Sequence, residues 1–198
     1  MIKKSIFFVY SLMCLLGLSG CLTKSINPFY TQETAIETPK GMEGKWRTIK
    51  SRNEDIPSKE ALDINIKGNQ MIVTERGKIS IFLDIQFFKV KGQDYIDFAL
   101  NAHHHKLEKF NDYIKLTHGV FKIEKVTKGI ALTPINPKWL SDFLKKHPSI
   151  GAIEEGDCKE YCEIMLTAPS KDLVRMLKGM KNNKQAFPVD DKVILKKI

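Results

Sequence analysis

Three consecutive histidines form the one tract in this chain whose residue types and spacing could bind a metal ion. They are His103, His104 and His105. Neutral imidazoles are common ligands for zinc and copper. Neighbours on a strand point to opposite faces, so at most two of the three could share an ion on a regular backbone. Glu108, Asp112 or His118 would have to complete the shell. A polar exposed loop explains the tract more simply, so we expect no metal cofactor and keep metal binding as the alternative.

The cysteines are the residues best suited to covalent chemistry, and the chain has four of them. Cys14 and Cys21 lie in or beside an apolar N-terminal run, whereas Cys158 and Cys162 stand four residues apart. In an oxidising compartment we expect the second pair to form a disulfide. Side chains at this spacing on a helix are too far apart for that bond, so we expect a bent loop there. The alternatives are a free thiol pair or half of a metal site, for which the chain has no second cysteine pair.

Catalytic signatures are missing from the sequence. It contains no Gly-x-Ser-x-Gly elbow, His-Glu-x-x-His helix, phosphate-binding loop or dinucleotide fingerprint. Cys158 and His147 could form a thiol nucleophile, but a disulfide would consume the thiol. Two pairs of adjacent acids, at 154–155 and 190–191, would need facing positions across a cleft for glycoside hydrolysis, which the sequence does not show. We therefore expect a protein that is not an enzyme, with hydrolysis of envelope polymers as the weakest hypothesis.

The N-terminal residues have the organisation of a secretory signal. Lys3 and Lys4 form a short basic opening, residues 6–18 carry no charge, and small residues follow. An uncleaved membrane helix is the alternative, but thirteen uncharged residues are short of the roughly 20 that a spanning helix needs. Export therefore fits the pattern best.

The tetrad Leu18-Ser19-Gly20-Cys21 resembles the lipobox of bacterial lipoproteins. The resemblance implies cleavage before Cys21 and fatty acyl chains, such as palmitate, on its sulfur and new amino group. Two or three chains hold a protein stably, whereas one holds it only reversibly. Leu22 stands where Asp would imply inner-membrane retention, so the resemblance implies an outer-membrane lipoprotein facing the periplasm. In a cell without an outer membrane, the anchor would lie on the outer face of the plasma membrane.

The chain is basic, with a formal net charge of +9. Loss of the two signal lysines leaves the mature chain near +7. Such a charge would often indicate nucleic acid, but export removes that partner. The remaining polyanions are lipid head groups, lipopolysaccharide and wall polymers, and a lysine-rich solvated surface explains the charge without any partner.

Three regions follow from this organisation: a signal peptide at 1–20, a lipidated flexible tether at 21–41, and a single β-rich globular domain at 42–198. Residues 22–41 show neither helix nor strand periodicity. As a flexible chain of this length they would span about 25 Å on average. A core in the remaining residues is large enough for independent folding.

Alternating apolar and polar residues between Gly and polar turns predict a mainly β, α+β fold with an antiparallel meander. The expected strands are 44–49, 62–67, 70–75, 79–88, 95–100, 113–116, 120–126, 130–133, 163–167 and 192–198. Two helices interrupt the pattern, at 137–146 after the N-cap residue Asn136 and at 169–180, with a loop at 150–161. We expect the meander to close into a barrel or a strongly curled sheet.

Gly44-x-Trp46 at the start of the first strand resembles the opening motif of lipocalins. The resemblance implies a barrel with the Trp across its closed end and an apolar ligand entering the other end. Helices at 137–146 and 169–180 depart from that family. The order of the C-terminal half resembles uncharacterised bacterial lipoproteins: a strand ending at 132–134, a helix bearing Trp139, then a helix after 166–168. We expect a non-enzymatic binding or structural module for an apolar or amphipathic envelope ligand.

Overall fold

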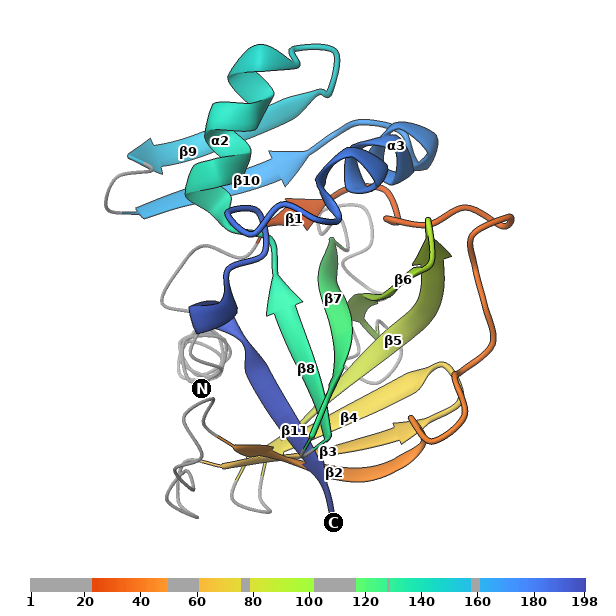
Figure 1. Cartoon of the computed structure of the whole chain (residues 1–198). Coiled ribbons are helices and arrows are strands. Elements are labelled where there is room, and N and C mark those ends of the chain that lie inside the picture. The colour runs from red at the N-terminus through yellow and green to blue at the C-terminus, as the bar shows by residue number, and fades with distance from the viewer. Residues whose placement is uncertain (1–22, 50–60, 76–78, 102–116, 128, 158–160) are drawn as a thin grey trace, which may run out of the picture.

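Eight antiparallel strands close into a barrel in the computed structural model, which describes residues 23–49, 61–75, 79–101, 117–127, 129–157 and 161–198. The barrel strands are β2 (Gly44–Ile49), β3 (Leu62–Lys67), β4 (Gln70–Glu75), β5 (Ile79–Val90), β6 (Gln93–Leu100), β7 (His118–Val126), β8 (Gly129–Pro134) and β11 (Val193–Lys197). Strands β2 to β8 pair in chain order, and β11 closes the ring between β8 and β2 (Figure 1). The predicted meander and its closure are confirmed.

Tight turns hold neighbouring strands in register. Lys91 and Gly92 join β5 to β6 with φ angles of 49° and 80°. Positive φ at both central residues is the geometry of the two-residue hairpin whose twist matches that of its strands. The register then sets Phe87 opposite Ile96 and Phe88 opposite Tyr95. Because successive side chains alternate between faces, each of these strands presents apolar residues to both sides of the barrel wall.

Apolar side chains fill the interior of the barrel. Trp46 is 4% exposed, and its Nε1 donates a hydrogen bond to the Met42 carbonyl at 2.8 Å. The other buried members of this cluster are Met42, Leu62, Ile64, Ile66, Met71, Val73, Ile85, Phe87, Ile96, Phe98, Ile123, Ile130, Leu132 and Leu195. An eight-stranded barrel is just wide enough for its side chains to fill. Trp46 therefore belongs to the core of the barrel, as the lipocalin resemblance implies.

The remaining elements gather at one end of the barrel (Figure 1). They are β1 (Lys24–Ser25), α2 (Pro137–Lys146), β9 (Ala152–Asp157), β10 (Tyr161–Leu166) and α3 (Ser170–Met180); the exception is the short helix η2 (Val189–Asp191), which contacts β8 and directly precedes β11. β1 lies between β7 and β10, and β9 is the outermost strand, so these three strands extend the barrel sheet. We call α2, α3, β1, β9 and β10 the helical end.

A second apolar core joins the helical end to the outer wall of the barrel. Phe88 and Tyr95 from the wall stack with ring centroids 5.3 Å apart, and Tyr95 also contacts Phe187 at 6.1 Å. The helices and β10 contribute the buried side chains Leu140, Leu144, Ile164, Leu166, Leu173, Met176, Leu177 and Met180. The two cores are thus the two sides of β5 and β6.

Both predicted helices are confirmed. Asn136 caps α2, since its Oδ1 accepts a hydrogen bond from the Trp139 N–H at 3.0 Å, and Pro137 occupies the first turn. The strands are confirmed where they are described, and the one expected at 113–116 lies outside the described residues. The expected loop at 150–161 is wrong, because Ala152–Asp157 forms β9 and pairs residue by residue with β10. Its sequence, Ala-Ile-Glu-Glu-Gly-Asp, lacks the alternation of a half-buried strand.

The predicted tether is also wrong from Thr23 onward. β1 is hydrogen-bonded on both sides, and Phe29 is fully buried, with its N–H donating to Asp97 Oδ2 at 2.9 Å. Further along, the Ile36 N–H donates to the Phe87 carbonyl at 2.9 Å. Main-chain hydrogen bonds and one buried aromatic ring fix this segment without any periodic pattern. Residues 23–41 therefore belong to the folded domain, which was expected to start near residue 42. Among the described residues, no helix is both long and apolar enough to span a membrane.

Candidate ligand-binding site

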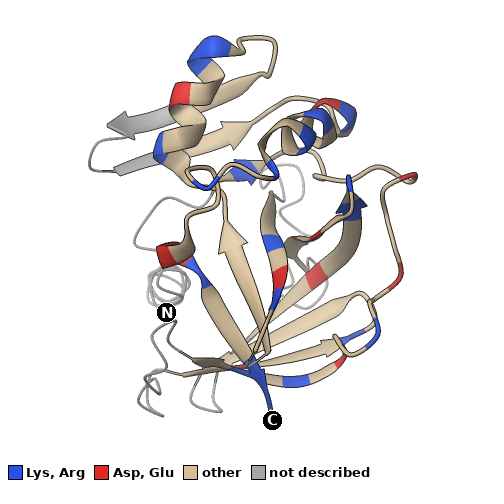
Figure 2. Ribbon diagram, viewed as in Figure 1, with Lys and Arg blue, Asp and Glu red and all other residues tan. Residues whose placement is uncertain are grey.

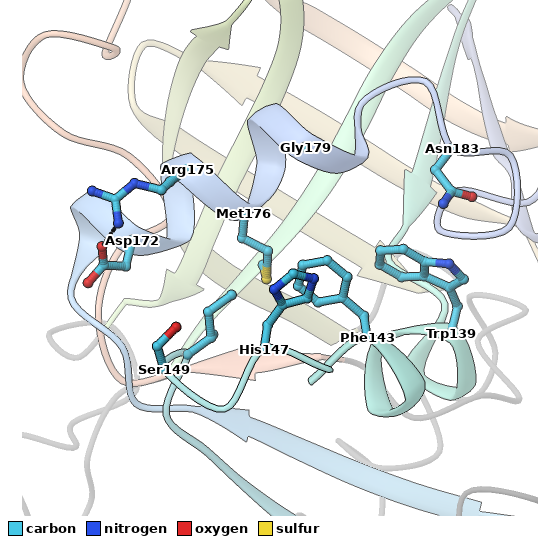
Figure 3. Close-up of a pocket in the computed structure, with 10 residues that line it drawn as sticks. Trp139, Phe143, His147, Ser149, Asp172, Arg175, Met176, Gly179 and Asn183 are labelled. Atoms are coloured by element: carbon cyan, nitrogen blue, oxygen red, sulfur yellow. Dashed lines mark hydrogen bonds and ion pairs between the residues drawn. The ribbon is translucent and has the colours of Figure 1, made fainter. Parts of the chain in front are cut away.

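A pocket of about 610 Å³ lies between α2 and α3 at the helical end (Figure 3). This volume is within the range typical of small-molecule sites. Its lining residues are Trp139, Phe143, His147, Ser149, Ile150, Asp172, Arg175, Met176, Gly179 and Asn183. We call this space the interhelical pocket.

Three rings in contact along α2 form one wall of the interhelical pocket. Trp139 and Phe143 have centroids 5.1 Å apart and planes 23° apart, and Phe143 lies 4.1 Å from the His147 ring. Residues four apart on a helix are surface neighbours, so this spacing builds a continuous stripe along α2. Leu140 and Leu144 point from another side of the helix into the core, where they are buried. The amphipathicity of α2 therefore gives it one core face and one aromatic face, and the aromatic face remains partly exposed.

The α3 wall combines an apolar floor with a charged rim. Met176 is 3% exposed, and Figure 3 shows its thioether between α3 and the aromatic stripe. The preceding residue, Arg175, pairs its Nη1 with Oδ1 of Asp172, about one turn earlier on α3, at 2.9 Å. Gly179 has no side chain, and an added Cβ there would meet nothing within 4 Å, so this position leaves the pocket open.

Asn183 and Ser149 supply uncharged polar groups to the lining. The Asn183 Oδ1 accepts hydrogen bonds from the Gln185 N–H at 2.8 Å and the Ala186 N–H at 3.2 Å, which fixes the orientation of the amide. Aromatic and thioether surface beside a few oriented polar groups is the usual composition of a site that binds an organic molecule. The arrangement suits a ligand with an apolar body and a polar or charged part.

The predicted metal ligands do not assemble among the described residues. His118 pairs its Nδ1 with Asp97 Oδ1 at 2.8 Å, and that carboxylate, 3% exposed, also holds the Phe29 N–H. No group of three His, Cys, Asp or Glu side chains in the described part of the chain could hold an ion. The histidine tract at 103–105, Glu108 and Asp112 lie outside the described residues, so their metal binding stays a prediction.

The sequence-predicted cysteine sites are described only in part. Cys21 and Cys158 lie outside the described residues, and the backbone of Cys162 lies in β10 opposite Gly156. The lipid anchor and the disulfide therefore stay predictions.

The two acidic pairs belong to different elements of the fold. Glu154 and Glu155 follow one another along β9, and Asp190 and Asp191 lie in η2. Burial, and then the neighbouring charge of Asp190, raises the pKa of Asp191 above its usual value. Asp190 and Asp191 are not among the residues that line the interhelical pocket.

Helix periodicity groups Trp139 and Phe143 with Leu140 and Leu144 on one apolar face, so it does not distinguish the pocket-lining rings from the buried leucines. The spacing of Trp139, Phe143 and His147 is the signal that could have distinguished the pocket face from the core face. A stripe that ends in histidine is less apolar than a core face. Comparisons of the chain with family models, with curated proteins and with solved structures found no match.

Proposed function

We propose that this protein is a non-enzymatic lipoprotein of the bacterial cell envelope that binds an apolar or amphipathic ligand in the interhelical pocket. Acyl chains on Cys21 would hold it in the membrane, and Leu22 favours the outer membrane with the domain facing the periplasm. The anchor is supported by the residues 18–21 and the apolar run before them. The ligand is supported by the geometry between α2 and α3.

The aromatic stripe is the observation that carries the binding proposal. Trp139 and Phe143 are only partly buried, although they pack against a core that buries Leu140 and Leu144. A ligand that covers partly exposed aromatic side chains removes their apolar surface from water, and this favours binding. Apolar side chains occupy the barrel interior. The ligand is therefore assigned to the interhelical pocket, and not to the barrel as the lipocalin resemblance implies.

The ligand test uses the two tryptophans of the chain as reporters. In a Trp46→Phe variant, Trp139 is the one remaining tryptophan. Titration with a short-chain lysophospholipid below its micelle concentration is expected to shift Trp139 fluorescence saturably. Met176→Lys, which places a charge on the pocket floor, should weaken binding by about tenfold or more, equivalent to roughly 1.4 kcal/mol. Val189→Lys places the same charge on an exposed apolar side chain outside the pocket and is the matched control. Absence of any saturable response to lysophospholipid or to a hydrophobic dye would remove the proposal.

The anchor has its own test. Cys21→Ala should abolish incorporation of radioactive palmitate and release the protein from the membrane fraction. Cys14→Ala changes a cysteine inside the signal and should leave labelling unchanged. Continued labelling of the Cys21→Ala variant would refute the anchor and leave the ligand proposal standing.

A further inference from the structure

We propose that α2 and α3, the two helices of the helical end, lie against an anionic phospholipid surface and that the barrel points away from the membrane. The orientation rests on the proposed acylation of Cys21. The affinity of the surface for anionic lipid does not, because it follows from the charges and aromatic side chains of the helical end itself.

The first argument is the shortness of the link between the anchor and the fold. β1 begins at Lys24. The preceding residue, Thr23, is buried in the fold, with only 3% of its surface exposed. Three residues span at most about 11 Å, so an acylated Cys21 cannot be farther than that from Lys24. A flexible tether would have let the domain move freely above the bilayer. The observed packing of 23–41 instead brings the domain directly to the membrane surface.

The second argument is the position of that link. β1 pairs with β10 on one side and with the start of β7 on the other, so it belongs to the sheet on which α2 and α3 pack (Figure 1). The chain therefore enters the fold at the helical end. An anchor attached there holds this end closer to the lipid than the far end of the barrel.

The third argument is the distribution of charge. Residues 136–151 and 164–187, which contain both helices, have eight Lys and Arg against two Asp, a formal net charge of +6. The described residues of the barrel and η2, together with the turns that join them (42–49, 61–75, 79–101, 117–127, 129–135 and 188–198), have ten Lys and Arg against nine Asp and Glu, a net charge of +1. Figure 2 shows basic residues at several positions along both helices. The exposed ones include Lys138, Lys145, Lys146, Lys171, Arg175 and Lys178.

This charge belongs to the helices and not to the whole helical end. β9 and the start of β10 contain four acidic residues, so an anionic surface would be repelled there. Basic side chains near a bilayer are attracted by anionic lipids over about one Debye length. Partly exposed Trp139 on the same surface has the amphipathic ring that favours the level of the head groups. The helices, rather than the β9–β10 hairpin, therefore face the lipid.

The two tryptophans make this orientation measurable, since Trp139 lies at the helical end and Trp46 lies inside the barrel. Full-length acylated protein, purified from membranes, is reconstituted into vesicles of phosphatidylethanolamine and phosphatidylglycerol with brominated acyl chains. Trp46→Phe then reports on Trp139, and Trp139→Phe reports on Trp46. We expect Trp139 to be quenched about threefold or more strongly than Trp46, because bromine quenches only at membrane depth. Replacing phosphatidylglycerol by phosphatidylcholine, or raising the salt, should reduce the quenching of Trp139.

A charge-reversal pair tests the surface directly. Lys146→Glu with Lys178→Glu changes one exposed lysine on each helix and should reduce Trp139 quenching severalfold. Lys45→Glu with Lys67→Glu makes the same change of charge on exposed barrel lysines and should not. Circular dichroism of both double variants checks that they fold. If either fails to fold, the comparison of Trp139 with Trp46 quenching in the protein without charge reversals decides the orientation.

The outcomes separate this inference from the proposed function. Three results would overturn the inference: stronger quenching of Trp46 than of Trp139, no quenching of either tryptophan, or quenching that does not depend on the charge of the lipid. None of these would contradict the proposed anchor or the proposed ligand site. If palmitate labelling shows that Cys21 is not acylated, the proposed anchor fails. Cosedimentation of the same full-length chain with phosphatidylglycerol vesicles then tests whether the helices bind anionic lipid. Binding that is abolished by the charge reversals on the helices supports this affinity, and absence of binding refutes it.

Discussion

Asp97 is the buried charged residue with the best-defined contacts in this protein. Its carboxylate accepts the Phe29 N–H at 2.9 Å and lies 2.8 Å from His118 Nδ1, which links the N-terminal segment to β6 and β7. Asp97→Ala would leave a buried N–H without a partner, and such a loss costs about 1–3 kcal/mol. We expect the urea midpoint of unfolding to fall accordingly. Asp63→Ala removes an exposed partner of Arg47, and its midpoint should barely change. Equal effects of the two substitutions would contradict the role assigned to Asp97.

Glu124 gives the fold a dependence on pH. Burial raises the pKa of its carboxyl, but hydrogen bonds from Lys192 at 2.5 Å and Lys122 at 3.0 Å outweigh this, so the pKa lies below its usual value. A depressed carboxyl pKa stabilises the fold above the unfolded-state pKa, and this stability is lost as the pH falls through the folded-state value. Glu124→Gln should therefore lower Tm at pH 7 and flatten the loss of Tm below about pH 4.5. If the Tm of the wild type and of the Glu124→Gln variant changed with pH in parallel, the role assigned to Glu124 would be contradicted.

Asp191 provides a control of opposite sign. Its pKa is raised by burial and by Asp190, so the folded state resists its ionisation. That contribution opposes folding at neutral pH and disappears as the pH falls. Asp191→Asn should therefore leave Tm at pH 7 unchanged or slightly higher, whereas Glu124→Gln lowers it.

At the scale of elements, the sequence predicted what periodicity and turn chemistry determine. The alternation in β3 and β5 and the cap at Asn136 are local signals, and the elements they predict are present. β1 and β9 were missed because two residues, or an acid-rich edge, hold strand geometry only through their partners in the sheet. The interhelical pocket was missed for a related reason. Sequence shows that α2 has an apolar face, but the packing of α3 decides which part of that face stays open.

Phe29 tests the ordered N-terminal segment. A tether would tolerate any residue at this position, whereas the fully buried ring predicts that Phe29→Ala costs about 3–5 kcal/mol. The measurement is the free energy of unfolding in urea. Ile153→Ala shortens a side chain that is 56% exposed on β9, and its effect should stay within about 0.5 kcal/mol. An equally small effect of Phe29→Ala would contradict the packing of this segment and favour the flexible tether expected from the sequence.

At the scale of the whole molecule, the two cores share a wall. Phe87 and Ile96 point into the barrel, while Phe88 and Tyr95, the next residues on the same strands, point into the core of the helical end. Neither core can lose β5 or β6 without exposing the other. The barrel and the helical end should therefore unfold as one cooperative unit, although they differ in architecture and in charge.

The two tryptophans report on the two cores separately and so test this coupling. Trp139→Phe leaves Trp46 as the reporter, and Trp46→Phe leaves Trp139. We expect the two fluorescence signals to show the same dependence on urea. Each fluorescence midpoint is first corrected for the effect of its substitution, measured by circular dichroism. Phe88→Ala removes a ring from the core of the helical end alone, yet it should shift both fluorescence midpoints together, because the shared strands transmit the loss. Loss of the Trp139 signal at clearly lower urea than the Trp46 signal would show that the helical end opens on its own. The barrel would then be the stable unit, and the membrane-facing surface would be a separable layer upon it.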